Sequence, residues 1–250
     1  MIKYTEKHII PCYDTDAAWR LKPTSFMNMA QEAAGRHAVY LGFGYDDLIK
    51  NNTAWILSRV HVEFVDTPKW REEITLNTWH KGLNRLFFLR DFVLTDNEGR
   101  ERVKATTSWL VLNLETRRLV RDPKLLEEGT VCLENALETP ADKVQMPKDV
   151  EAELVRRHVV SYSDIDTNGH TNNAMYMQWS MNAVGYEITS TLPVKEFTIN
   201  FNHETKAGDE VEIYRASVEK EDGLHVYVEG KVGDVSSYCV EIVFFKPVRQ

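Results

Sequence analysis

Residues 164–173 read D-I-D-T-N-G-H-T-N-N, a stretch that holds two Asp, three Asn and one His immediately before a helix-like run. A partial copy of this stretch lies earlier in the chain. Asp14 and Asp16 occur 150 positions before Asp164 and Asp166. The spacing of the two acidic pairs indicates that the chain contains a repeat.

The polar residues that follow the acidic pair are not repeated. Ala18 occupies the position of Asn168, and Arg20 occupies the position of His170. This difference predicts a duplicated fold in which only the second copy retains the chemistry.

A second alignment supports the duplication. Alternating apolar residues end an apparent strand in each half, namely Val60, Val62 and Phe64 in the first and Phe197, Ile199 and Phe201 in the second. This offset is 137 positions, so the first half has a longer connection after its helix. Two matches in the same order favour a tandem repeat of ~100 residues.

Each copy is expected to contain a strand, a turn, a long helix and then several strands. The first helix should begin near Pro23, and the second near Asn172 or Asn173. Further strands are expected at residues 86–94, 108–114, 224–230 and 238–245, with hairpin turns at Asn97 and Glu221. One helix with several antiparallel strands per copy predicts an α+β protein in which each helix is wrapped by a curved sheet.

The region between the copies has a different composition. Residues 121–154 contain three prolines, are rich in acidic side chains and lack sustained alternation, so they are interpreted as a linker with a short helix around Leu125. The expected organisation is therefore residues 1–120, a linker over 121–154, and residues 155–250.

Composition excludes several functional classes. The net charge of −8 argues against a broad nucleic-acid-binding surface. No apolar run of ~18 residues predicts a membrane span, and the N-terminus has no signal-peptide core. Cys12, Cys132 and Cys239 lie far apart and form no metal-ligand spacing. We expect a cytoplasmic protein with no cofactor.

A metal site is the first alternative for the polar stretch. D-x-D-x-N-G resembles the opening of a calcium loop, but the twelfth position, where a bidentate Glu is required, is Met175. His170 has no nearby His or Cys partner for zinc. No metal is therefore expected.

A purely structural turn is the second alternative, because Asp and Asn bond their own backbone and Asn-Gly is a strong turn former. The first copy, however, continues as A-A-W-R-L-K-P and lacks His170 and the Asn172–Asn173 pair. The fold therefore does not require these residues, which favours a function.

The residue types suit acyl transfer. In an extended segment, Asp166, Asn168 and His170 would point to one side. The N-terminus of the following helix would supply N–H groups that can stabilise an oxyanion. Glu204 follows the second-copy strand, whereas its first-copy counterpart is Thr67.

Several segments in the same order resemble the acyl-acyl-carrier-protein (acyl-ACP) thioesterases of the plant and bacterial type, which are built from two tandem hotdog folds. The first half contains M-N-M-A-Q-E-A-A-G-R-H, W-I-L-S-R-V-H-V-E-F, T-P-K-W-R-E-E-I-T-L-N-T-W and T-S-W-L-V-L-N-L-E-T-R-R-L. In the second half, D-I-D-T-N-G-H-T-N-N-A-M-Y matches the family's Asp-x-Asn-x-His pattern.

The resemblance implies hydrolysis of the thioester that links a fatty acyl chain to the phosphopantetheine arm of its carrier. It places the catalytic residues at Asp166, Asn168, His170 and Glu204. The Asp166 carboxylate would act on the carbonyl directly or through water. Asn168 and His170 would hold and polarise the Asp166 carboxylate, and Glu204 would orient or activate water. The first hotdog is expected to hold the acyl chain.

One position departs from many relatives, which carry Cys after the catalytic Glu. This chain has Thr205 there, so a cysteine nucleophile at that position is excluded. The missing plastid transit peptide favours a bacterial-type enzyme.

Three other functions remain open within the same fold: an acyl-CoA thioesterase, an acyl-thioester dehydratase and a non-catalytic acyl-thioester binder. A dehydratase mechanism has no obvious role for Asn168 and Glu204. A non-catalytic binder leaves unexplained why both candidate carboxylates and His170 lie in one copy. The carrier is acidic, so docking should use basic residues, with the candidates Arg117, Arg118, Arg121, Arg156 and Arg157. A monomer or a homodimer is expected.

Overall fold

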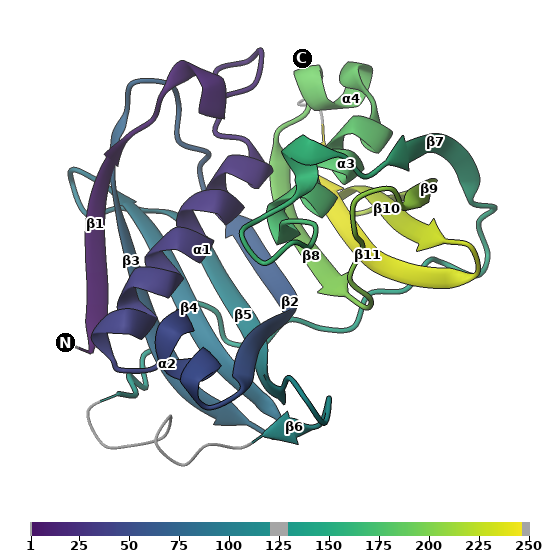
Figure 1. The fold of residues 1–250 in the computed structure, drawn as a ribbon. Coiled ribbons are helices and arrows are strands. Elements are labelled where there is room, and N and C mark those ends of the chain that lie inside the picture. Colours follow the sequence, from purple (N-terminus) through teal and green to yellow (C-terminus); the bar gives the residue numbers. More distant parts are fainter. Residues whose placement is uncertain (1, 121–129, 247–250) are drawn as a thin grey trace.

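The computed structural model describes residues 2–120 and 130–246. These residues form one eleven-stranded antiparallel sheet with two long helices on one face (Figure 1). The α+β architecture of two tandem hotdog units, each a long helix wrapped by an antiparallel sheet, is confirmed.

The first half contains β1 (Lys3–Ile9), α1 (Pro23–Tyr40), α2 (Tyr45–Lys50), β2 (Thr53–Phe64), β3 (Glu73–Asn84), β4 (Phe87–Asp96), β5 (Glu101–Asn113) and β6 (Leu119–Val120). The second half contains β7 (Glu153–Val159), α3 (Asn173–Val184), α4 (Tyr186–Thr191), β8 (Val194–Phe201), β9 (Glu210–Lys220), β10 (Gly223–Val232) and β11 (Val235–Phe244). A short 3-10 turn precedes each long helix, at Cys12–Asp14 and at Tyr162–Asp164.

The strand order shows the internal symmetry. It runs β1-β3-β4-β5-β2-β8-β11-β10-β9-β7, so the second half repeats the first in reverse from the β2–β8 junction outwards. At that junction His61 lies opposite Thr198, which is its own counterpart at the offset of 137. A residue that pairs with its own repeat marks a pseudo-two-fold axis.

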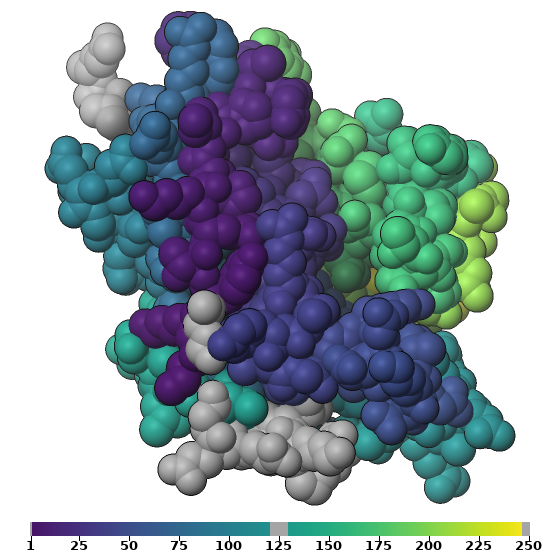
Figure 2. Space-filling view, turned by 60° about the vertical axis from the view of Figure 1, so that its left-hand side comes forward, coloured from purple at the N-terminus to yellow at the C-terminus, as the bar shows by residue number. Residues whose placement is uncertain are grey.

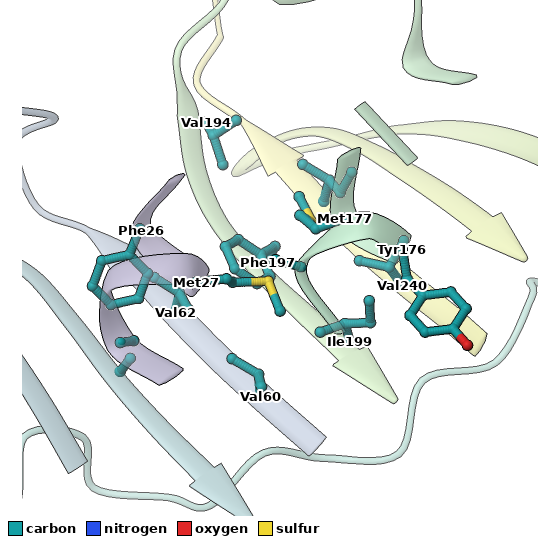
Figure 3. Packing of buried hydrophobic residues seen from close by; sticks show 14 of the residues in the cluster. Phe26, Met27, Val60, Val62, Tyr176, Met177, Val194, Phe197, Ile199 and Val240 are labelled. Atoms are coloured by element: carbon teal, nitrogen blue, oxygen red, sulfur yellow. The ribbon is translucent and has the colours of Figure 1, made fainter. Parts of the chain in front are cut away.

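The core is continuous across the junction. α1 begins with Pro23 in its first turn, where the missing N–H costs nothing, and it buries Phe26 and Met27. These side chains lie beside Val62 of β2 and Phe197 of β8 (Figure 3). In the space-filling view the N-terminal residues and the second half meet along one face (Figure 2). The helices α1 and α3 are in contact, so the two units share one interior.

The described part of the linker, residues 130–152, packs against the sheet. Arg90 reaches His37 of α1, so its neighbour Asp91 lies on the opposite face of the sheet. Asp91 accepts a bond there from the Ala136 backbone N–H at 2.7 Å, and Asn200 accepts one from Val144 at 2.6 Å. Residues 130–152 therefore line the outer face of both halves without forming a strand or helix. The helix expected around Leu125 and the docking candidate Arg121 lie outside the described residues.

Within residues 2–120 and 130–246, no helix has both the length and the apolar character that crossing a membrane requires.

Candidate active site

The polar stretch forms a closed turn at the start of α3. Asp166 donates its backbone N–H to the His170 carbonyl at 2.9 Å, and Gly169 donates to the Asp166 carbonyl at 3.0 Å. Gly169 has φ 76°, a conformation that glycine adopts without strain. The extended segment expected from the sequence is therefore wrong, because Asn-Gly and the Asp side chain close a turn instead.

The first copy makes the same turn. Asp16 donates to the Arg20 carbonyl at 2.9 Å, as Asp166 does to His170. The Asp16 carboxylate accepts from the Ala18 N–H at 2.8 Å, matching the bond from Asn168 to Asp166 at 2.8 Å. The aspartate therefore holds the turn in both copies, whereas the side chains of Asn168 and His170 are not needed for it.

The four predicted side chains form two pairs at this turn. His170 Nε2 lies 3.4 Å from Glu204 Oε2, and Asn168 Nδ2 donates to Asp166 Oδ2 at 3.4 Å. The side chains of His170 and Glu204 are 37% and 40% exposed, so a substrate can reach both. The bond between the Asp166 N–H and the His170 carbonyl links the two pairs.

Two cations lie beside Glu204. Lys206 Nζ is 3.8 Å and Arg117 Nη2 is 3.6 Å from Glu204 Oε1. Arg117 comes from the turn between β5 and β6, so the first half also contributes to the site. Its contact with Glu204 was missed from the sequence because it depends on β2 pairing with β8, which no local pattern signals.

Thr205 is fully buried. Its hydroxyl lies 2.7 Å from the Thr171 hydroxyl and 3.0 Å from the Tyr176 hydroxyl. Burial raises the pKa of Tyr176, so this phenol stays protonated and can donate. The Thr205 side chain ties the end of β8 to α3 and is not presented to solvent. Burial also raises the pKa of Cys239, to about 12, so that thiol remains un-ionised.

Asp164 has a structural role that removes the calcium alternative. Its Oδ2 accepts from His158 at 2.9 Å and from the Ser161 N–H at 2.8 Å, and its Oδ1 accepts from Trp179 at 3.2 Å. Both oxygens are therefore engaged within the protein. Burial pushes the pKa of Asp164 up, but the bonds from Ser161 and His158 outweigh it and leave the pKa lowered.

The N-terminus of α3 is partly satisfied by its own cap. The Asn172 side chain accepts from the Ala174 N–H at 3.0 Å, and the Asn172 carbonyl accepts from Met175 at 2.8 Å. Fewer backbone donors are therefore free for an oxyanion here than the sequence suggested.

Comparison with known proteins shows the family. The model of the acyl-ACP thioesterase N-terminal domain matches residues 1–127, and that of the C-terminal domain matches residues 147–244. The chloroplastic oleoyl-acyl carrier protein thioesterase of Coriandrum sativum is 26% identical over 94% of this chain and 68% of that protein. Thioesterase 1 of the same description from Arabidopsis thaliana is 25% identical over 84% of this chain and 63% of that protein. The chain thus spans about two thirds of the length of these plant relatives.

Solved structures show the same fold over the whole chain. An acyl-ACP thioesterase from Bacteroides thetaiotaomicron superposes with a TM-score of 0.79 at 26% identity, covering 97% of each chain. The 12:0-ACP thioesterase from Umbellularia californica has a TM-score of 0.84 at 20% identity, covering 97% of this chain and 94% of that one. With a tandem hotdog fold and both family models matched in order, this chain belongs to the acyl-ACP thioesterase family, a family of thioester hydrolases.

Proposed function

We propose that this protein hydrolyses the thioester of a fatty acyl-acyl carrier protein, releasing a free fatty acid and the carrier. The observation that supports this most directly is the contrast between the two turns. The same backbone bonds hold both, but only the second turn carries Asn168, His170 and a neighbouring Glu204. Those groups are exposed and have no part in closing the turn.

The two side-chain pairs suggest a division of roles. Asn168 holds the Asp166 carboxylate, which acts on the thioester carbonyl as a nucleophile or as a base toward water. His170 is beside Glu204, so this pair can orient water and pass a proton to the departing thiolate. Both routes use the same four residues and need no metal.

The acyl chain is assigned to the first half as part of this proposal. A cavity between α1 and the sheet is lined by apolar side chains that include Met27, Leu57, Phe92 and Trp109. Its volume is about 20 Å³, so an acyl chain needs these side chains to move apart. The proposed division remains residues 1–120 for the chain-binding hotdog, a linker over 121–154, and residues 155–250 for the catalytic hotdog.

The carrier is proposed to dock beside Arg117 and Arg118. Arg118 is exposed in the same β5–β6 turn as Arg117, which contacts Glu204. Arg157 is a weaker candidate, because Glu212 accepts from its guanidinium at 2.8 Å and matches its charge. An acidic carrier bound at the β5–β6 turn beside Arg117 and Arg118 would place its prosthetic arm next to the candidate active site.

The decisive experiment is a hydrolysis assay over matched acyl-ACP and acyl-CoA panels of varied chain length. The proposal expects higher kcat/KM for the carrier-linked substrates. Equal or faster turnover of acyl-CoA would instead favour the acyl-CoA thioesterase, and binding without turnover on either panel would favour the non-catalytic binder.

Because both halves of the site lie in one chain, a monomer suffices. A cytoplasmic location completes the proposal on compositional grounds.

A further inference from the structure

A cavity of about 420 Å³ lies at the N-terminus of α1, where the first half would have its own active site. Its lining includes Arg20 and Thr67, the first-copy counterparts of His170 and Glu204. The first copy has therefore kept a pocket at this position although it lacks the candidate catalytic residues. None of the roles proposed above uses this cavity.

Backbone donors are free at the entrance to α1. The first helical bond runs from the Phe26 N–H to the Lys22 carbonyl at 3.1 Å, so the N–H groups of Thr24 and Ser25 precede it and have no helical acceptor. Lys22 occupies the N-cap position and its side chain makes no capping bond. The helix end thus carries a partial positive charge and unsatisfied donors.

Two buried hydroxyls lie at the same place. Thr24 is 8% and Ser25 is 6% exposed, and both line the cavity. Among the described residues, neither hydroxyl has a hydrogen-bond partner. Their oxygens are not among the enclosed unpaired atoms of the described residues, so they open onto the cavity, where a bound acceptor can reach them. The second copy differs, because Asn172 caps α3 from within the protein.

The charges around the cavity select the kind of anion. Arg20 is held by Asp16 at 2.8 Å, so its charge is matched. The ammonium of Lys22 donates to the Tyr13 carbonyl at 2.8 Å, and Asp14 lines the same cavity. Two cations and two carboxylates cancel, which leaves only the partial charge of the helix. That balance suits a singly charged carboxylate better than a phosphate dianion.

The remaining wall is mixed, with polar side chains such as Asn28, Gln178 and Asn182 on one part and an apolar group on another. Phe64, Met181, Leu192 and Val194 form the apolar group, and Val194 lies at the upper end of β8 in Figure 3. A volume of about 420 Å³ is within the range of small-ligand sites. A ligand that fills this cavity should therefore combine a carboxylate with an aliphatic chain.

We propose that this cavity is a second, non-catalytic site that binds a fatty acid. The carboxylate accepts from the N–H groups and hydroxyls of Thr24 and Ser25, and the chain lies against Phe64, Met181 and Val194. Only the identification of this ligand with the reaction product rests on the proposed function. Binding itself requires no turnover, so the two proposals can fail independently.

The test is calorimetric titration of the full chain with octanoate, octanol and acetate. The main variant is Lys22→Asn, which copies Asn172 and supplies an internal cap to α1. It should weaken octanoate binding at this site at least tenfold while the melting temperature stays level or rises. The double variant Thr24→Val with Ser25→Ala should weaken binding similarly by removing both hydroxyls.

The variant His170→Ala distinguishes this cavity from the candidate active site. Octanoate binding at the cavity, which Lys22→Asn should weaken, should persist in the His170→Ala variant. Loss of that binding in His170→Ala, with retention in Lys22→Asn, would assign octanoate to the catalytic turn and overturn the proposal. Octanol or acetate binding as tightly as octanoate would also overturn it, because the site must recognise both the carboxylate and the chain. Lack of saturable octanoate binding to the unaltered protein would have the same consequence.

Discussion

The turns before α1 and α3 have the same backbone bonds and different side chains. In both, an aspartate closes the turn and the residue three positions later has positive φ, Trp19 at 65° in the first and Gly169 at 76° in the second. The comparison shows that the aspartate alone is weak evidence for catalysis, since Asp16 does the same structural work. The evidence for a site lies in Asn168, His170 and Glu204, which the first copy lacks.

The largest expected effect tests that contrast directly. Asp166→Asn keeps an oxygen that can accept from the Asn168 N–H, so the turn should persist. It removes the charge and replaces the oxygen that accepts from the Asn168 side chain with an NH2 group. It should lower kcat by about 10²-fold or more, the scale for loss of an acid–base group. Asp16→Asn is the matched control and should leave kcat nearly unchanged. Steady-state kinetics on acyl-ACP measures both, and equal losses in the two variants would contradict the division between the copies.

The second test compares Glu204 with its counterpart Thr67. Glu204→Gln should reduce kcat by about 10²-fold, because the neutral amide cannot accept a proton from water. It also removes the negative charge that lies beside His170. Thr67→Val should be silent in the chemical step. A rate that survives Glu204→Gln would remove Glu204 from the mechanism and leave the Asp166 pair to act alone.

The docking surface should affect KM rather than kcat. Arg118→Gln removes an exposed charge from the β5–β6 turn and should raise KM for acyl-ACP by about tenfold at low salt, with a smaller effect at high salt. Arg157→Gln is the control, since Glu212 already matches its charge. An acyl-pantetheine substrate without the carrier should be insensitive to both changes. A larger effect from Arg157→Gln would move the docking surface to β7.

Thr205 has Pro68 as its counterpart, and in each copy the carbonyl at this position accepts from the backbone before the long helix, from Thr171 and Leu21 respectively. Thr205→Val removes only the buried hydroxyl. It should lower the free energy of unfolding by about 1–3 kcal/mol, because Thr171 and Tyr176 lose a partner, while kcat is largely retained. Urea unfolding and kinetics on the same samples check this, and complete loss of turnover in a folded variant would contradict the carboxylate mechanism.

The smallest effect concerns pH and the pair Asp164 and Asp14. The pKa of Asp164 is lowered in the fold, so its carboxylate stabilises the native state above the unfolded pKa of about 4 and loses that contribution as pH falls through the folded pKa. Asp164→Asn should therefore be most destabilising near neutral pH. The difference in free energy of unfolding between this variant and the unaltered protein should narrow below about pH 4. Asp14→Asn should change little, and a constant gap for Asp164→Asn across pH would contradict the assignment.

Local signals predicted the local structure well. Pro23 and the Asn172–Asn173 pair located both long helices, and the turns at Asn97 and Glu221 do connect antiparallel strands. The short helices α2 and α4 were missed because six residues are too few to show a helical period. The candidate site residues could be named from their chemical types and from the absence of Asn168, His170 and Glu204 equivalents in the first copy.

Long-range geometry could not be read from the sequence. The packing of residues 130–152 on the outer face rests on single bonds such as Val144 to Asn200, which leave no periodic pattern. The contact between Arg117 and Glu204 joins opposite halves, and the linker and the second-half elements up to β8 separate the two residues in sequence. The extended form expected for residues 166–170 was wrong because alternation does not distinguish a strand from a turn closed by Asp and Gly.

The junction of β2 and β8 carries a consequence for how the two copies could diverge. In a symmetric dimer of identical subunits, every substitution near one site appears in the other as well. Here His61 meets Thr198 within a single polypeptide, so the two edges are joined while their sequences are independent. Covalent fusion thus permits the two sites to specialise separately. Separating the two halves would expose the unpaired edges of β2 and β8. The two copies can therefore diverge in sequence but not come apart as independent domains.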